Sequence, residues 1–414
     1  MLSPALLLLA SVALSAQPSL TGREYVERVL ASGLEAKVAE REAALGRAEA
    51  VGVRRWPNPS LQWQRESARR GDGSLESQDI VAASVQLVLS GRLGLEAESA
   101  ALGARAAEAR RDQALLLLRY EATRAFARAL EAQERRALLE NSLVTLRRFE
   151  AALAAGEKAG EVAGYEHLRV SIEVATVEDL LRGTMLEERT RKAEVLRLLP
   201  PDFGALPPLQ GPLVEEGALP SREQLLSALE ARPEVRAWTL EAKSAELARR
   251  SAARGWIPEP TVTGGAQFLD VGQPGAVAGY VVGLSLPLPL FQRRQGDVAR
   301  EEARRELAEA QRASLLHTAR TRLAAVHDEV TGRRERLAFH RTTVLGRTEE
   351  LRRAAEAAWR GGSADLLIRV DAERASREAR LTALELALSV VEAETGLFLL
   401  AGASEGTEPR STPR

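Results

Sequence analysis

The chain has 414 residues, with 57 Lys and Arg against 58 Asp and Glu, and its formal net charge is −1. A nearly neutral chain has no large electrostatic attraction to nucleic acid or acidic lipid, and Arg interleaved with Glu is typical of solvated helix faces. The sequence contains no cysteine, which excludes disulfides, thiolate metal sites, cysteine nucleophiles and a lipid anchor on an N-terminal cysteine.

Residues 1–16 predict a secretory signal peptide. Their apolar core covers residues 5–14 and ends in small residues, which places cleavage after Ser15 or Ala16. The apolar core is too short to span a membrane as a mature helix, and no later uninterrupted apolar run reaches the roughly 18 residues that a span requires. Because no Lys or Arg precedes the apolar core, a buried N-terminal helix remains the alternative.

The mature chain begins with a predicted helix over residues 20–55. Thr21 and Glu24 have the spacing of a capping box, in which each residue satisfies a free backbone amide of the first turn. Pro57 and Pro59 end the helix, because proline lacks the amide hydrogen and clashes with the preceding turn. These residues open the first of two repeats, which we place at residues 17–201.

The rest of the first repeat predicts a hairpin and two helices. Two segments of alternating polarity give strands at about residues 60–89. Residues 92–157 hold no proline, so they predict a helix roughly 100 Å long, which does not fit a compact globule. A second helix follows at residues 163–199, and proline-rich residues 202–219 predict a linker.

The same order of elements returns in residues 220–401. The second repeat predicts strands at about residues 261–290, a long helix over residues 292–360 and a last helix over residues 364–400, before a disordered tail at residues 402–414. Trp56 and Trp256 are 200 residues apart, and Ser84 and Ser285 are 201 apart. The fold class is therefore mainly α with a small β part, as a duplicated unit of helix, hairpin, long helix and helix.

One face of the predicted strands is apolar, and Ser285 and Gln86 lie on the other. Four strands cannot close a membrane barrel, because the smallest natural ones have about eight. A barrel built from several chains would place the apolar side chains against lipid and the polar ones against water inside. A small soluble sheet at the end of a coiled coil is the alternative. The residues predicted to face lipid are Val85, Leu87, Leu89, Tyr280, Leu284, Leu286 and Leu288.

No pattern for catalysis, cofactor binding or metal binding stands out. The four histidines include no pair at the i, i+4 spacing of a helical metal site, so we interpret them as residues of helix faces. No phosphate loop and no Ser–His–Asp arrangement is apparent. We therefore expect no enzymatic activity, no cofactor and no metal site.

These features together resemble the TolC family of outer-membrane efflux proteins. The resemblance covers roughly residues 20–400 and rests on the order of elements, the tryptophan and spaced prolines before each hairpin, the Pro-Leu-Phe after the second, and the duplication. GGSADLL at residues 361–367 and VDAER at residues 370–374 look like that family's G-x-x-x-x-L-L and L-D-A-x-R. AGEKAG at residues 155–160 and LRVSIEV at residues 168–174 are similar to the heavy-metal (CzcC-like) branch rather than the drug branch.

The resemblance implies a homotrimer in the outer membrane of a Gram-negative bacterium. Three chains would give a twelve-stranded barrel, continued by a long α-helical barrel in the periplasm. The duct would meet a periplasmic adaptor protein and an inner-membrane pump of the RND type, and would passively conduct substrates, with heavy-metal cations as the candidate cargo. An exported soluble coiled-coil scaffold without channel activity is the alternative function.

The resemblance also places the two turns between long helices at the periplasmic tip, against the adaptor. Glycines allow the left-handed backbone with which a helix ends, and small residues leave room for a partner hairpin. A plain connection between helices is the alternative. The candidate adaptor-contacting residues are Gly156, Glu157, Gly160, Gly164, Gly361, Gly362, Ser363 and Asp365.

Overall fold

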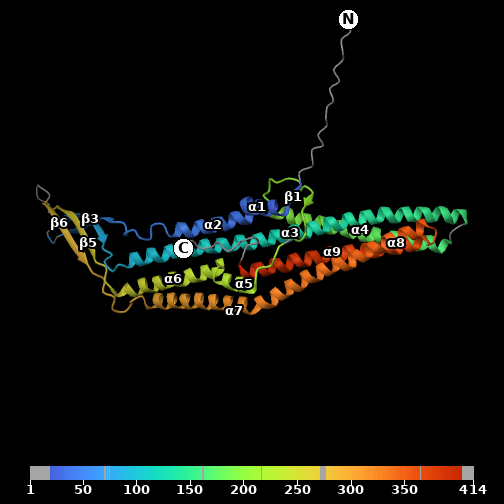
Figure 1. Cartoon of the computed structure of the whole chain (residues 1–414). Helices are drawn as coiled ribbons and strands as arrows, with labels where there is room; N and C mark the ends of the chain where they lie inside the picture. The colour runs from blue at the N-terminus through green and yellow to red at the C-terminus, as the bar shows by residue number, and fades with distance from the viewer. Residues whose placement is uncertain are drawn as a thin grey trace, which may run out of the picture. The chain divides into compact units, whose positions relative to one another are not determined.

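The structure is a computed structural model that describes residues 19–402, except 70, 72, 74, 161–162, 216, 271–276 and 364. The expected signal peptide and residues 403–414 of the expected tail lie outside the described residues. The helices are α1 (Gly22–Ser32), α2 (Leu34–Glu49), α3 (Arg92–Ala159), α4 (Gly164–Leu198), α5 (Arg222–Ala228), α6 (Pro233–Ala253), α7 (Gln295–Phe339), α8 (Gly346–Arg360) and α9 (Leu366–Ala401) (Figure 1). The strands are β1 (Leu20–Thr21), β2 (Ser60–Arg69), β3 (Leu75–Gln86), β4 (Leu209–Gln210), β5 (Thr261–Asp270) and β6 (Val277–Ser285). Two 3-10 turns, η1 (Leu229–Ala231) and η2 (Arg254–Trp256), and one π-helical turn, η3 (His340–Leu345), complete the described elements.

The chain divides into two compact units that cut across the sequence repeats. Unit 1 contains residues up to 37, residues 115–222 and residues from 323 onward, and unit 2 contains residues 38–114 and 223–322. Each unit therefore takes segments from both halves of the chain. The predicted long helix of the first repeat is α3, a single helix of 68 residues. No described helix carries an apolar run long enough to cross a bilayer.

The first helix begins as predicted but does not run on to residue 55. Thr21 and Glu24 form the capping box, since Thr21 N donates to Glu24 Oε2 at 3.1 Å and Glu24 N donates to Thr21 Oγ1 at 3.4 Å. Gly33 is extended, with ψ 152°, and separates α1 from α2. A Cβ on Gly33 would lie 2.5 Å from the Val29 carbonyl oxygen and 2.9 Å from that of Leu198. The single predicted helix was wrong because the chain packs its backbone closely at this glycine.

The core of unit 1 joins the start of the chain to the long helices. Tyr25 is fully buried, its hydroxyl donates to the Val195 carbonyl oxygen at 3.1 Å, and its ring centroid lies 5.6 Å from that of Phe126. Burial raises the pKa of Tyr25, because the phenolate would lose its hydration. The predicted linker takes part in this unit, since Leu209 of β4 pairs in parallel with Leu20 of β1.

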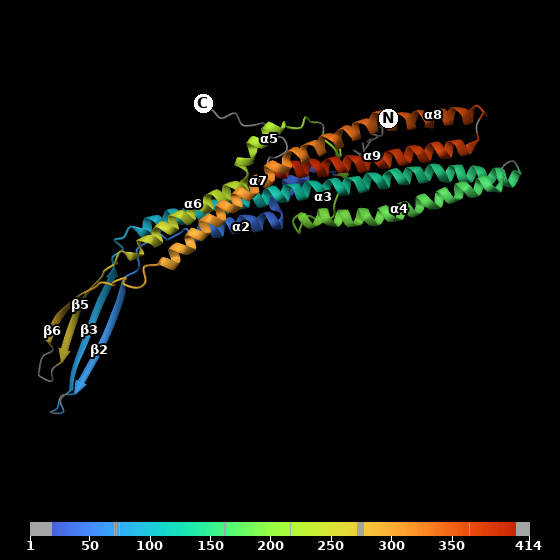
Figure 2. The same ribbon diagram turned by 90° about the horizontal axis from the view of Figure 1, so that it is seen from below.

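Unit 2 contains a four-stranded antiparallel sheet in the order β2-β3-β5-β6, as Figure 2 shows. Both predicted hairpins are present, and β3 pairs with β5 to join them. The strands end earlier than predicted, at Gln86 and Ser285 rather than near residues 89 and 290. Pro287 and Pro289 follow β6 and have no amide hydrogen to donate to a ladder, which explains why pairing stops there.

The long helix of the second repeat is also divided. The sequence predicted one helix over residues 292–360, whereas the structure has α7 starting at Gln295, the π-helical turn η3 and then α8. The π-helical turn has i→i+5 hydrogen bonds, and its residues include no proline or glycine that would mark it in the sequence. The helices after the two turns, α4 and α9, lie within two residues of their predicted bounds.

Candidate functional site

The sheet of unit 2 has one apolar face that lies exposed. The register places Trp63, Val81, Ala266 and Tyr280 in one row across the four strands. Trp63 is 65% exposed and Tyr280 is 85% exposed. Large apolar side chains gathered on one exposed surface are uncommon in soluble monomers and mark an interaction with lipid or protein. Further members of this face, from adjacent rows on one side, are Leu61, Ala83, Val85, Val262, Gly264, Val282 and Leu284. The adjacent row on the other side holds Phe268 and Ala278 together with the ion pair of Arg65 and Asp79, so the apolar surface ends there.

The opposite face of the sheet is mainly polar. Gln64 Nε2 donates to Glu66 Oε1 at 2.7 Å along β2, and the hydroxyls of Ser84 and Thr263 lie 2.8 Å apart across the β3–β5 pair. Because side chains of a strand alternate between faces, the same four strands carry both surfaces. The sheet is therefore amphipathic, with one face suited to hydrocarbon and the other to water.

The seven residues predicted to face lipid divide into two groups. Val85, Tyr280 and Leu284 lie on the apolar face of paired strands. The other four follow the last paired residues of β3 and β6, so the assignment of these residues to strands was wrong: Leu87, Leu89, Leu286 and Leu288.

The sequence-based set of lipid-facing residues also omitted exposed members of the apolar face. Leu61 is 78% exposed and Val282 is 77% exposed. The alternation of Leu61 and Trp63 with Gln62 and Gln64 is the signal that could have found the β2 members. The register was needed to show that all four strands share this face.

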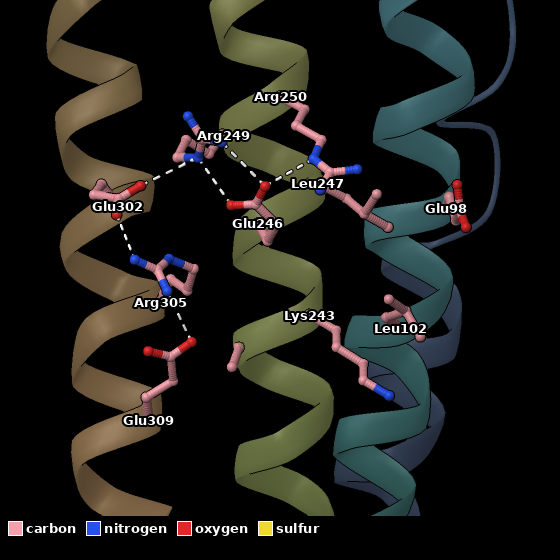
Figure 3. A pocket seen from close by; sticks show the side chains of 11 residues that line it. Glu98, Leu102, Lys243, Glu246, Leu247, Arg249, Arg250, Glu302, Arg305 and Glu309 are labelled. Carbon is pink, nitrogen blue, oxygen red and sulfur yellow. Dashed lines mark hydrogen bonds and ion pairs between the residues drawn. The ribbon is translucent and has the colours of Figure 1, made fainter.

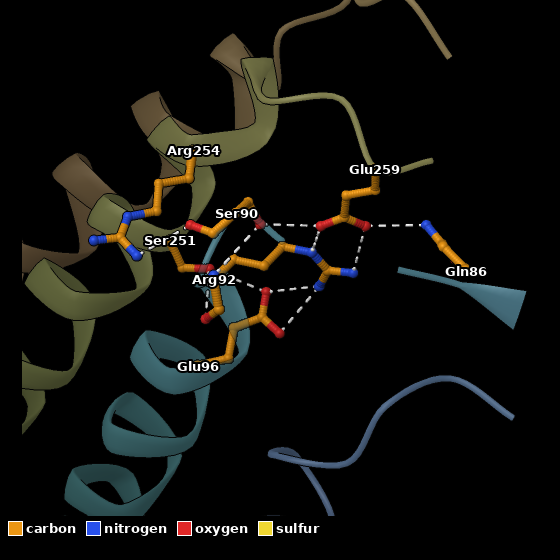
Figure 4. A network of polar contacts seen from close by, with 7 residues as sticks. All are labelled: Gln86, Ser90, Arg92, Glu96, Ser251, Arg254 and Glu259. Atoms are coloured by element: carbon orange, nitrogen blue, oxygen red, sulfur yellow. Dashed lines mark hydrogen bonds and ion pairs between the residues drawn. The ribbon is translucent and has the colours of Figure 1, made fainter. Parts of the chain in front are cut away.

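A partly buried ionic cluster holds the two repeats together where the first hairpin leads into α3 (Figure 4). Glu259, between two prolines ahead of β5, accepts hydrogen bonds from Arg92 Nε at 2.7 Å, Ser90 Oγ at 3.1 Å and Gln86 Nε2 at 3.0 Å. The side chains of Arg92 and Glu259 are only 16% and 12% exposed. Arg92 also pairs with Glu96 at 3.1 Å.

The protonation of this cluster follows from its contacts. Burial by itself would raise the pKa of Glu259, but hydrogen bonds from Arg92 and Ser90 outweigh burial and lower the pKa overall. The hydrogen bond to Glu259 likewise raises the pKa of Arg92. The cluster is thus a clamp between repeats rather than a proton-transfer site. We call Gln86, Ser90, Arg92 and Glu259 the junction clamp.

A groove of about 780 Å³ on α3, α6 and α7 of unit 2 is lined by paired charges (Figure 3). Glu246 accepts from Arg249 Nε at 2.8 Å and from Arg250 Nε at 2.7 Å, and these bonds lower the pKa of Glu246 to about 2. Glu302 binds Arg249 at 3.1 Å and Arg305 at 2.5 Å. These carboxylates are bound to arginines and do not form an acid–base pair of the kind that catalysis needs.

The eight candidate tip residues lie at the two turns between long helices of unit 1. Gly160 and Gly362 have φ values of +75° and +69°, the left-handed geometry with which a helix commonly ends in glycine. Gly156 is half-buried and the other seven candidates are exposed. Glu157 Oε2 lies 2.6 Å from His167 Nδ1, and Ser363 Oγ donates to the Ala358 carbonyl oxygen at 3.1 Å.

Close to the second turn, Arg369 of α9 connects the α8–α9 hairpin to α3. The sequence patterns did not identify this residue. The Arg369 guanidinium lies 4.6 Å from the ring centroid of Phe149 on α3 and 4.3 Å from that of Trp359 on α8. It also pairs with Glu356. Such stacking of a cation on aromatic faces stabilises partly buried sites by roughly 1–2 kcal/mol.

Among the described residues, no group of three His, Asp or Glu side chains is placed to hold a metal ion.

Comparison with known proteins shows which of them this chain resembles. Residues 225–403 match the family described as outer membrane efflux protein, whose members are passive channels and not enzymes. Among curated proteins, none matches the sequence significantly.

Solved structures match the fold over almost the whole chain. CusC aligns with a TM-score of 0.75 and 16% identity, covering 94% of this chain and 93% of its own. The CmeC outer membrane channel of Campylobacter jejuni aligns with a TM-score of 0.77 and 13% identity, covering 94% and 87%. The MtrE outer membrane channel of Neisseria gonorrhoeae aligns with a TM-score of 0.71 and 18% identity, covering 92% and 89%. The chain therefore has the fold of solved outer-membrane channels, and residues 225–403 match the outer membrane efflux protein family.

Proposed function

We propose that the protein is the homotrimeric outer-membrane exit duct of a tripartite efflux system, which conducts substrates passively out of the cell. The observation that carries this proposal is the amphipathic sheet of unit 2. Its apolar face leaves Trp63, Tyr280 and Val282 exposed, and its other face carries Gln64, Glu66 and Thr263. Because the chain shares its fold with outer-membrane channels, we interpret the apolar face as a surface that contacts lipid.

The physics of the bilayer favours a closed assembly of several chains. Backbone polar groups in hydrocarbon have no water to bind, so a sheet spans a membrane only where its edges are paired. One chain contributes four strands to its described sheet, fewer than the smallest natural barrels have. Three copies would supply twelve strands and enclose a lumen lined by the polar face.

We further propose that the two turns at residues 156–164 and 360–365 contact a periplasmic adaptor protein. Members of the matched family are homotrimers that work with an adaptor and an inner-membrane RND pump. The exposed glycines at these turns, Gly160 and Gly362, leave space for a partner hairpin. Heavy-metal cations are the proposed cargo, on the resemblance of the first turn to the CzcC-like branch.

Fractionation and conductance test the duct directly. The protein is expected in the outer-membrane fraction, as a species whose mobility on a gel changes between unboiled and boiled samples. Purified protein is expected to produce stepwise ion conductance in planar lipid bilayers. A monomer recovered in the soluble periplasmic fraction, without conductance, would overturn the proposal in favour of a soluble coiled-coil scaffold.

A separate experiment tests the cargo. A strain that lacks the gene is compared with its parent for growth inhibition by divalent metal cations and by organic dyes. Greater sensitivity to metals alone supports metal efflux. Greater sensitivity to dyes alone contradicts the metal assignment and leaves the duct in place.

A further inference from the structure

A groove lies on unit 2 where the second hairpin passes into the helices (Figure 2). It has a volume of about 780 Å³ and is formed by the end of α6, the segment after β6 and the first turns of α7. Apolar side chains beside Pro289 in the chain are also open to solvent, since Leu288 and Leu290 are each 64% exposed. The apolar residues that line the groove are Ala253, Trp256, Pro289, Val298 and Ala299.

Three polar residues complete the lining, and two of them are already bound within the chain. Gln295 uses both ends of its amide on backbone atoms, and its Oε1 accepts from Arg293 N at 2.8 Å. Glu302 binds Arg249 at 3.1 Å and Arg305 at 2.5 Å. The third is Arg293, whose guanidinium forms no hydrogen bond or ion pair with the residues that the structure describes. The groove therefore combines an apolar lining with one available cation.

The first repeat shows what an arginine at this position does when a carboxylate is present. The two hairpins begin at residues 60 and 261 and repeat in register with this offset of 201, so Arg293 is the equivalent of Arg92. Arg92 binds Glu259 in the junction clamp, whereas the position equivalent to Glu259 is Asn58, which carries no charge. Arg293 thus keeps the position of the clamp arginine and lacks its carboxylate.

Two further arginines add positive charge beside the groove. The stem of Arg294 lies over Gly255, where a Cβ would come within 2.5 Å of Arg294 Cδ. Arg294 has a φ of +57°, an uncommon backbone for a residue with a side chain. Arg254 Nη1 donates to the neutral Ser90 carbonyl oxygen at 3.2 Å. Glu259 is close enough to Arg294 to act on it through space, but both of its oxygens are already bonded within the clamp.

The groove lies just beyond one end of the sheet. The strands β2, β3, β5 and β6 have 10, 12, 10 and 9 residues, close to the 9–11 or so with which a tilted strand crosses the hydrocarbon of a bilayer. Ser285 ends β6 and pairs with Thr261, which begins β5. Pro289 and Trp256 lie four and five residues beyond that pair. Tryptophan is enriched where hydrocarbon meets water, so this is the level of the lipid phosphates if the sheet spans the membrane.

We propose that the groove binds a phospholipid with a net negative headgroup, whose phosphate is held by Arg293 and whose acyl chain lies along Trp256 and Pro289. This inference rests on the proposed outer-membrane duct and adds a lipid site to it. A guanidinium can donate two parallel hydrogen bonds to a phosphate. The apolar lining would stay uncovered beneath inorganic phosphate, but an acyl chain covers it. We call this site the lipid groove.

The charge around the lipid groove selects between headgroups. A zwitterionic lipid carries an ammonium group beside its phosphate, and that cation would approach Arg254, Arg293 and Arg294. A lipid such as phosphatidylglycerol has the phosphate without the ammonium group. Each arginine near a membrane surface favours anionic lipid by roughly fivefold in binding.

Lipid retention tests this preference. The full-length protein is purified in a neutral detergent and titrated with phosphatidylglycerol or with phosphatidylcholine of the same acyl chains, and native mass spectrometry counts the bound lipid. The test variant is Arg293→Gln. The matched control is Arg322→Gln, because Arg322 is exposed, pairs with no carboxylate among the described residues and lies roughly 40 Å along α7 from Gln295.

The natural protein and the control are expected to retain phosphatidylglycerol in preference to phosphatidylcholine. Arg293→Gln is expected to weaken the binding of phosphatidylglycerol about fivefold and to leave that of phosphatidylcholine unchanged. Equal retention of the two lipids by the natural protein would overturn the proposal. So would an equal loss in Arg293→Gln and Arg322→Gln, because the effect would then follow net charge rather than the groove.

Fluorescence quenching locates the bound lipid. Bromine atoms on an acyl chain quench tryptophan on contact, and a variant that keeps Trp256 while phenylalanine replaces the other four tryptophans reports on the groove alone. In phosphatidylcholine vesicles, a small fraction of brominated phosphatidylglycerol is expected to quench Trp256 more than the same fraction of brominated phosphatidylcholine. Trp256→Phe in the otherwise natural protein gives the same answer by difference. A second copy of the chain covering the groove would leave Trp256 unquenched by either lipid and overturn the proposal.

The outcomes separate the lipid groove from the function. Conducting oligomers in the outer membrane that show no preference for phosphatidylglycerol overturn the lipid groove and leave the duct standing. A preference that Arg293→Gln removes, in a natural protein that does not conduct, supports the groove and contradicts the duct. Loss of both the preference and the conductance overturns both.

Discussion

The exposed apolar face gives the sharpest prediction, which concerns Val282→Arg. Val282 is 77% exposed on the apolar face of β6, so in a soluble protein the substitution would change stability by only about 0.5 kcal/mol. If the face meets hydrocarbon, arginine near mid-membrane costs roughly 2–4 kcal/mol. That cost corresponds to roughly a 30- to 700-fold change in the equilibrium constant for membrane insertion of each copy. We therefore expect Val282→Arg to abolish most of the trimer in the outer membrane.

The neighbouring residue supplies a matched control. Val281 belongs to the same strand but to the opposite face, so Val281→Arg places the same charge towards the proposed lumen. Leu286→Arg completes the series beyond the last paired residue, where the expected cost falls to about 0–1 kcal/mol near the membrane interface. The assay is the yield of unboiled trimer in washed outer membranes, normalised to total protein. Equal yields for Val282→Arg and Val281→Arg would refute the assignment of the apolar face to lipid.

Three further changes probe the packing and charge of the two units. Gly33→Ala forces a Cβ against two carbonyl oxygens and is expected to destabilise unit 1 by about 1–3 kcal/mol. The control is Gly183→Ala, whose new Cβ meets no neighbouring atom within 4 Å and which is expected to be neutral or stabilising. Thermal unfolding measures both variants. The lowered folded pKa of Glu246, about 2 against 4.5, makes its contribution present above pH 4.5 and lost as the pH falls towards 2. Over that interval the natural protein should lose more stability than Glu246→Gln, and parallel pH profiles would contradict the pairing. Arg369→Met removes the cation from the ring of Trp359 and is expected to lower the free energy of unfolding by about 1–2 kcal/mol. It is also expected to change Trp359 fluorescence, and an unchanged spectrum would argue against the cation–ring contact.

Much of the local structure could be predicted from the sequence because its signals are local. The capping box needs only Thr21 and Glu24 three residues apart, and both of its hydrogen bonds are present. The absence of proline over residues 92–157 was enough to predict α3, which ends at Ala159. Strand starts at Ser60 and Thr261 follow from alternation after the spaced prolines.

What the sequence left undecided depends on residues that are distant along the chain. The break at Gly33 is set partly by the backbone of Leu198, and the end of β6 at Ser285 reflects where the ladder with β5 stops. Arg369 was one arginine among many until the fold placed the rings of Phe149 and Trp359 close to its guanidinium.

By itself, the sequence determined the duplicated order of elements, the long helices and the amphipathic strands, since periodicity, prolines and glycines act within a few residues. Only the tertiary structure decided that β3 pairs with β5, that four strands share one apolar face, and that Glu259 closes on Arg92 across 167 residues of chain. Register and ionic pairing are choices between many similar partners, and with 57 basic and 58 acidic residues no local rule selects one pair. Packing selects it, because a buried charge is stable only where its partner and hydrogen bonds meet it.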